Sequence, residues 1–152
     1  MRKPQELRDY LLASVRDLKH NPEKLQIFID RGNLEARLQA SLHFEYKYTL
    51  NLIITDLADH ADVVLVPLLA WVKHAQPEMK EDAVEFEADI IDHSKIDLSI
   101  TLPLTERVLV STTVEGNYTT EHLGEPVPEW NLPDPALFKT LWHNEEKLTP
   151  DV

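Results

Sequence analysis

The sequence contains no cysteine and only three glycines among its 152 residues. Without cysteine there can be no disulfide bond, no thiolate metal site and no cysteine nucleophile. Three isolated glycines cannot supply either of the common glycine-rich phosphate loops. No stretch approaches the roughly 18 consecutive apolar residues of a membrane span, and the first residues lack the apolar segment of a signal peptide. We therefore expect neither a cofactor nor contact with a membrane.

Positive charge is scarce over most of the chain, which has 15 Lys and Arg against 27 Asp and Glu and a formal net charge of −12. Residues 1–31 carry seven basic side chains against five acids, whereas residues 56–106 carry three against twelve. A protein that reads nucleic-acid sequence needs a basic footprint, so this class is disfavoured. The acidic balance is compatible with simple solubility, or with a protein past which DNA moves without binding.

The usual catalytic signatures are also missing. There is no GxSxG, HxxxH or HExxH sequence. Two loops combine aspartate with histidine, namely Asp56, Asp59, His60 and Asp62, and Asp89, Asp92 and His93. The first lacks the spacing and the glycine of an EF-hand loop, and aspartate is common in loops and helix caps. We predict no catalytic residue and no metal site, and a metal-dependent enzyme using one of these loops is the less favoured alternative.

The most regular pattern lies in residues 41–55, SLHFEYKYTLNLIIT. Every even position from Leu42 to Ile54 is apolar or aromatic, and most odd positions are polar, which indicates a strand with one buried face. At ~3.3 Å per residue such a strand reaches about 45 Å, longer than the usual five or six residues. We expect it to project beyond the domain to which it belongs.

The remaining core pattern is that of an α+β domain with a mostly antiparallel sheet and two main helices on one face. The helices are expected at residues 4–19, with a stripe of Leu7, Tyr10, Leu11, Val15 and Leu18, and at 63–75, where Pro67 marks a kink or a late start. Strands are expected at 25–30, before a turn at 31–33, and at 96–102 and 106–114, before a hairpin turn at 115–118. Another is expected at 84–90, burying Val84, Phe86, Ala88 and Ile90.

The last part of the chain changes character. We divide the sequence into a core domain, residues 1–112, and a hairpin followed by a proline-rich acidic arm, residues 113–152. Asp134 and Pro135 are suited to cap and begin a short helix carrying Leu137, Phe138, Leu141 and Trp142. Large apolar side chains on such an arm need a surface to cover them. Two alternatives remain open: the arm folds back on its own core, or it docks on a neighbour.

Four segments resemble one known family: MRKPQELRDYLLASVRDLK, FEYKYTLNLIITDLADHAD, PLLAWVKHAQPE and FEADIIDHSKIDLSITLPLTERV. They are similar to the tail completion protein R family of P2-like contractile-tailed bacteriophages, over about residues 1–110. The arm from about residue 113 takes no part in the likeness. The resemblance implies a tail-terminator-like fold and no catalytic residues.

The resemblance also implies a structural protein of the virion of a contractile-tailed phage, or of a prophage or tail-like particle derived from one, assembled in the host cytoplasm. Such proteins form a ring, expected to be a hexamer, that caps the head-proximal end of the tail tube and sheath and offers a surface for head attachment. The implied partners are further copies of the chain, the tail tube and tail sheath proteins, and the connector or neck proteins of the head. DNA would pass through the lumen without sequence-specific binding. A head–tail joining protein added after tail completion is the alternative.

The long strand and the arm supply the residues that we predict at subunit or partner interfaces. A strand that reaches beyond its domain can pair with the next subunit around a closed ring, which leaves no open edge. Its aromatic end would lie at the subunit boundary, where tyrosine is favoured. The predicted interface residues are Phe44, Tyr46, Lys47, Tyr48, Trp130, Phe138, Leu141 and Trp142. A wholly internal strand bent by a bulge is the alternative.

Overall fold

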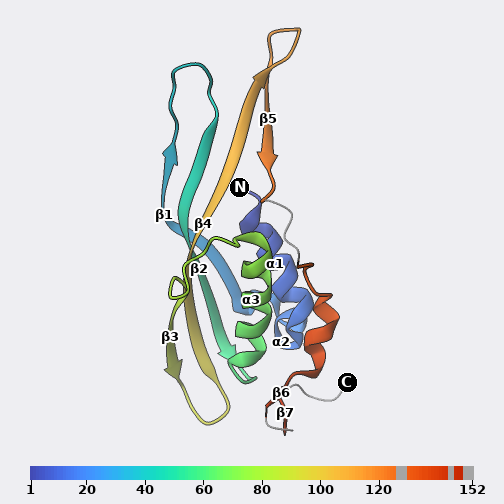
Figure 1. Ribbon diagram of the computed structural model, residues 1–152. Helices are drawn as coiled ribbons and strands as arrows, with labels where there is room; N and C mark the ends of the chain where they lie inside the picture. Colours follow the sequence, from blue (N-terminus) through green and yellow to red (C-terminus); the bar gives the residue numbers. More distant parts are fainter. Residues whose placement is uncertain (126–129, 144–145, 149–152) are drawn as a thin grey trace.

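A computed structural model shows a five-stranded antiparallel sheet with helices on one of its faces (Figure 1). It describes residues 1–125, 130–143 and 146–148. The sheet order is β1-β2-β4-β3, and β5 pairs with a different part of β4 from β3. The strands are β1 (Leu25–Glu35), β2 (Phe44–Leu57), β3 (Glu85–Ile90), β4 (Ile96–Thr112) and β5 (Tyr118–Leu123). This confirms the predicted α+β class and its antiparallel sheet.

The two main helices, α1 (Lys3–Ser14) and α3 (Asp62–Ala75), lie on the same face of the sheet, as predicted (Figure 1). The smaller elements are α2 (Arg16–His20), η1 (Pro22–Lys24), η2 (Pro135–Thr140), β6 (Trp142–His143) and β7 (Glu146–Lys147). Helix α3 begins at Asp62 and runs through Pro67, so the proline does not delay its start. None of the helices in the described ranges is long and apolar enough to cross a membrane.

The core fills the space between the sheet and these helices, because alternate side chains of β2 and β4 face the helical layer. The predicted apolar stripe of the first helix is fully buried or nearly so, as are the central residues of both strands: Leu50, Leu52, Ile54, Leu98, Ile100 and Leu102. Burial of each such side chain contributes about 1.5–3 kcal/mol. The predictions for the inward faces of 42–54 and 96–102 hold wherever the helices cover the sheet.

Strand β2 is as long as predicted, but both of its edges are occupied within the chain. It pairs with β1 from Glu45 to Ile54 and with β4 from Phe44 to Leu57. A register shift follows Ile54, and Asp56 there adopts a left-handed conformation with φ 51°. The predicted pairing of this strand with the next subunit is therefore wrong, because its backbone is already paired on both sides. The free edges in the described sheet belong to β1, β3 and β5.

The helix predicted at 4–19 is broken at Val15. Its backbone is extended there (φ −108°, ψ 113°), which separates α1 from α2. The hydroxyl of Ser14 donates a hydrogen bond to the carbonyl of Tyr10 at 2.7 Å, and such back-bonding is known to bend helices. Val15 itself is fully buried, so the break costs no apolar contact.

The turn predicted at 31–33 is also wrong, since β1 continues to Glu35 and the chain reverses within residues 36–43. Gly32 pairs with Tyr48, and a Cβ on Gly32 would lie 3.2 Å from the Cβ of Tyr48. The glycine is therefore explained by the close approach of two strands rather than by a turn.

Residues 96–112 form one strand instead of the two predicted on either side of Pro103. Strand β3 pairs with β4 as far as Thr101, and β5 begins to pair at Arg107. Pro103 lies in the interval between them, where β4 has no strand neighbour on that side. A proline, which lacks an N–H donor, is tolerated in such an unpaired interval.

The burial predicted for the strand at 84–90 is wrong. Val84 is half-buried, and every residue of β3 is exposed, including Phe86 at 63% and Ile90 at 80% of their surfaces. Strand β3 lies at the edge of the sheet, away from the helices that cover β2 and β4 (Figure 1). Its apolar side chains point to the same face as the core residues, but no described part of the chain covers them.

Two hairpins project past the helical layer at one end of the sheet, and the β3–β4 hairpin lies at the opposite end (Figure 1). The projecting hairpins are β1–β2 and β4–β5, which confirms the predicted long projecting hairpin. The predicted turn at 115–118 is confirmed, with Gly116 at φ +87°, a conformation that favours glycine.

The arm begins its helical segment as predicted, with Asp134 accepting a hydrogen bond from the amide of Ala136 at 2.9 Å. The segment is a short 3₁₀ helix that ends at Thr140, so Leu141 and Trp142 lie outside it, contrary to prediction. Parts of the predicted arm, residues 126–129, 144–145 and 149–152, lie outside the described residues. The division at 112/113 stays a prediction, although β5 belongs to the same sheet as the core strands.

Candidate functional site

The four predicted interface residues of β2 lie where the projecting hairpin leaves the helical layer. Phe44 and Tyr46 are half-buried, with ring centroids 5.0 Å apart in an edge-to-face arrangement. The ring of Tyr46 is also stacked on His122 of β5, 6.4 Å away. Lys47 forms an ion pair with Glu35 across the hairpin. These residues join β1, β2 and β5 within one subunit, and their place at a subunit interface stays a prediction.

Tyr48 is buried and has a different role from its three neighbours. Its hydroxyl donates a hydrogen bond to Oε2 of Glu106 at 2.6 Å. Burial, followed by the bond to Glu106 and the charge of that carboxylate, raises the pKa of the Tyr48 phenol well above its ordinary value. The hydroxyl therefore remains a neutral donor to a carboxylate that is itself only 5% exposed.

Glu106 connects the sheet to the beginning of the chain. Its Oε1 atom accepts from the backbone amide of Arg2 at 2.7 Å and from that of Lys3 at 3.4 Å. These amides belong to the first turn of α1, where backbone donors have no partner inside the helix and negative charge is favourable. One buried carboxylate thus holds β4, β2 and the start of α1 together.

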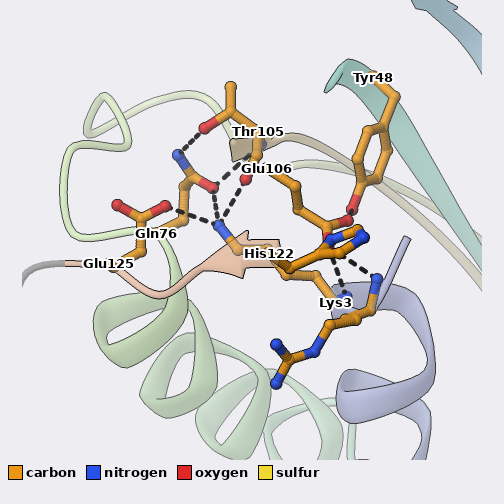
Figure 2. A network of polar contacts seen from close by, with 8 residues as sticks. Lys3, Tyr48, Gln76, Thr105, Glu106, His122 and Glu125 are labelled. Atoms are coloured by element: carbon orange, nitrogen blue, oxygen red, sulfur yellow. Dashed lines mark hydrogen bonds and ion pairs between the residues drawn. The ribbon is translucent and has the colours of Figure 1, made fainter. Parts of the chain in front are cut away.

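Lys3 extends this network to the interval of β4 that lacks a strand neighbour on the side of β3 and β5 (Figure 2). Its ammonium group donates to the carbonyl of Thr105 at 2.6 Å, to Oε1 of Gln76 at 2.8 Å and to Oε1 of Glu125 at 3.0 Å. Gln76 in turn accepts from the amide of Thr105 at 3.1 Å and donates to its hydroxyl at 2.9 Å. Side chains therefore replace the strand that would otherwise bond this part of β4.

The chemistry of this network is structural. The three donors of the Lys3 ammonium have three acceptors, so it is not free to act as a base or a nucleophile. A pocket of about 200 Å³ adjoins the network, lined by residues that include Glu6, His74 and His122. Nδ1 of His122 lies 3.8 Å from Oε1 of Glu106, a charged contact only when the imidazole is protonated. The arrangement can fix the two projecting hairpins to the helical layer.

The arm residues contact the subunit's own helices. The ring of Phe138 packs edge-on against Tyr10 at 6.2 Å, and Trp130 lies under the ammonium of Lys73 at 4.4 Å. The hydroxyl of Tyr10 donates to the carbonyl of Pro133 at 2.8 Å, and Leu141 packs against the core. The side chain of Trp142 lies outside the described part. The described arm thus follows the fold-back alternative, while a contact of these residues with a partner stays a prediction.

The two acidic loops do not gather into a metal site. Among the described residues, no group of three or more His, Asp and Glu side chains is placed to hold a metal ion. Asp59 is partly buried, which together with the nearby charge of Asp17 raises the pKa of its carboxyl. Asp92 instead accepts hydrogen bonds from the amide and the hydroxyl of Ser94, and these bonds lower its pKa. Ordinary loop chemistry accounts for these carboxylates.

The feature that sequence reasoning missed is the exposed apolar face of β3, defined here as the β3 strip: Phe86, Ala88 and Ile90. Alternation in EFEADI correctly gives one apolar face, but it does not say whether a helix covers that face. A signal was present, because acids crowd the segment at Glu81, Asp82, Glu85, Glu87 and Asp89. Charged side chains are typical of edge strands.

The comparisons with known proteins agree with this picture of a structural protein. The profile of a family described as P2 phage tail completion protein R (GpR) matches residues 1–126. A curated relative, Tail completion protein R of Escherichia phage P2, is 43% identical over 134 residues, which cover 84% of this chain and 86% of the relative. No solved structure gives a significant match. The resemblance noted over about residues 1–110 is thus confirmed and reaches further along the chain.

Proposed function

The chain belongs to the P2 phage tail completion protein R family, and from this premise we propose that it is a structural protein that completes the phage tail. The observation that carries the proposal is the 43% identity to a protein named for tail completion, over 86% of that relative's length. The proposed role requires assembly rather than catalysis. The buried polar network supports this, because the ammonium of Lys3 is paired with Glu125 and the carboxylate of Glu106 accepts hydrogen bonds from Arg2 and Tyr48.

In finer terms, the chain forms a tail-terminator-like ring at the head-proximal end of the tail. The ring caps the tube and the sheath and presents a surface for the head connector. A sheet with free edges on both sides, β1 and β3, supports a subunit that joins copies of itself on two flanks. The β1–β2 hairpin, which projects past the helices and carries Phe44 and Tyr46, supplies an arm with which a neighbour or the tube can be contacted (Figure 1).

The charge supports passage of DNA through the ring without binding. Glu85 and Glu87 of β3 pair with Thr101 and Ser99, which places their carboxylates on the face of the sheet that carries no helices. An acidic face of this kind repels the phosphate backbone. We place it toward the lumen.

The test is electron microscopy of the particles made when this gene is disabled, with the gene restored from a plasmid as the control. We expect headless particles whose tubes or sheaths are overlong and uncapped. Tails of normal length that fail to join heads would support instead the joining protein that acts after completion. Normal yields of infectious virions would contradict both roles.

A further inference from the structure

The β3 strip is an exposed apolar surface that the proposed function has not yet used. Phe86 and Ile90 are 63% and 80% exposed, and the outer edge of β3 makes no backbone pairing among the described residues. An exposed apolar edge strand is a template for pairing with another chain. Its acidic side chains disfavour random association but do not cover the apolar face.

Charge excludes pairing of β3 with the same strand of a second copy. A two-fold contact of that kind would bring Glu85, Glu87 and Asp89 against the same three carboxylates. Like charges directly opposite one another in a sheet are destabilising. The partner edge must therefore be neutral or basic.

The other long free edge, β1, meets this requirement. The part of β1 that is level with β3, residues 25–29, carries no charged side chain, while Asp30, Arg31 and Glu35 lie further along the strand. Arg31 is exposed and forms no ion pair with another described residue. A head-to-tail contact thus sets an uncharged part of β1 in one copy against the acidic β3 of the next.

Strand direction fits the same arrangement. All neighbours in the order β1-β2-β4-β3 are antiparallel, so the four strands alternate in direction. When a second copy is placed beside β3 with its sheet in the same orientation, its β1 runs antiparallel to β3. The antiparallel alternation of strands then continues from one copy into the next. Unlike edges of this kind produce a closed ring when the rotation closes.

The levels of the two strands along the sheet also match. Residues that follow one another as pairing partners across the sheet lie at the same height along the strands. By this pairing, Gln26 of β1 is level with Glu87 of β3, through Ile53 of β2 and Ser99 of β4. Ile27 of β1 is likewise level with Phe86 of β3, through Leu52 and Ile100. In a copy placed at the same level, Phe86 would meet the half-buried Ile27 on the helical face. Glu85 would lie on the opposite face, level with Phe28, and Asp30 and Arg31 follow further along β1.

We propose that the free edge of β3 binds the free edge of β1 in a second copy of this chain, so that successive copies form one continuous sheet head to tail. The β3 strip is then covered by β1 and the residues beside it. This inference rests on the proposed function, because a ring at the tail end is what repeated pairing of two unlike edges would build.

The absence of cysteine provides the test, because introduced thiols are the only ones present. The variant Gln26→Cys/Glu87→Cys places one thiol on each edge, at exposed positions of the same face and level. Tails carrying this variant in place of the natural chain, and the concentrated purified variant, are treated with a short bismaleimide. We expect a ladder from dimer upward that stops at the copy number of the ring.

The controls are the two single variants and the pair Gln26→Cys/Thr120→Cys, whose second thiol lies on exposed β5. Melting curves check that every variant folds. A ladder confined to the Gln26→Cys/Glu87→Cys pair supports the inference. Dimers from Glu87→Cys alone, an equal ladder from the β5 pair, or no ladder in either sample would overturn it. Absence of the chain from finished tails would contradict the proposed function instead, and the purified sample would still decide the inference.

Discussion

Strands β3 and β4 have nearly the same pattern and opposite surroundings. In each, apolar and polar residues alternate, and Phe86 of β3 pairs directly with Ile100 of β4. Ile100 is fully buried, whereas Phe86 is 63% exposed. The difference arises because α1 and α3 cover the middle of the sheet but not its β3 edge (Figure 1). Alternation specifies which face of a strand is apolar, and position in the sheet decides whether the subunit itself covers that face.

The largest expected effect on stability comes from truncating Ile100, and comparing it with truncation of Phe86 tests directly whether only β4 is covered within the subunit. Ile100→Ala leaves a cavity in the core and should cost about 3 kcal/mol of unfolding free energy, while Phe86→Ala should cost less than about 1 kcal/mol. Urea denaturation at low protein concentration, where copies do not associate, measures both. Equal costs would mean that Phe86 is covered within the isolated subunit, and the β3 strip would no longer be available to a partner.

The second comparison is between the stability contributions of a buried carboxylate, Glu106, and an exposed one, Glu87. Glu106→Ala leaves the Tyr48 hydroxyl and the amide of Arg2 without their acceptor, and should cost about 3 kcal/mol. Glu87→Ala on β3 is the matched control and should change stability by no more than about 0.5 kcal/mol. Thermal and urea unfolding give the two values. A small effect at Glu106 would show that the network does not fix the hairpins.

The sequence could predict much of the fold but little of this network. Periodicity located both main helices, the long strand and the turn near Gly116, because each depends on local pattern. The contacts of Glu106 with Arg2 and Tyr48 join parts of the chain that are far apart, and no local pattern specifies them. The interval of β4 near Pro103 that is paired only with β2 likewise follows from where β3 ends and β5 begins.

The predicted interface residues show the same limit. Tyr46 and Tyr48 alternate identically in the sequence, yet one stacks on His122 and the other is buried against Glu106. Which residues face a neighbour depends on the free edges of the finished sheet. The sequence placed the subunit contact on β2, whereas the structure leaves edges at β1, β3 and β5.

A pH experiment sharpens the assignment of the Tyr48–Glu106 bond. Burial and Glu106 hold the pKa of Tyr48 above its usual value of about 10, so its contribution to stability is present below about pH 10 and is lost as pH rises further. Tyr48→Phe should cost about 1.5 kcal/mol at neutral pH and should weaken the alkaline decline of the melting temperature. Tyr118→Phe, at an exposed position, is the control. An unchanged alkaline decline in Tyr48→Phe would contradict the assignment.

The smallest expected effect concerns the arm. Phe138→Ala removes a half-buried ring from Tyr10 and should cost about 1 kcal/mol, whereas the neighbouring exposed Leu137→Ala should cost almost nothing. Unfolding curves of the two variants check the difference. Should Phe138→Ala leave stability unchanged and reduce assembly, the arm would instead act mainly through a partner.

The most direct test of the account is complementation of the disabled gene with Phe86→Asp, examined by electron microscopy of the tails. Val114→Asp is the control, because Val114 is also an exposed apolar residue but lies at the tip of the β4–β5 hairpin. The account predicts that Phe86→Asp yields a folded protein but tails as defective as those made without the gene, whereas Val114→Asp restores them. Normal tails and normal virion yields with Phe86→Asp would contradict the claim that the β3 edge builds the ring that completes the tail.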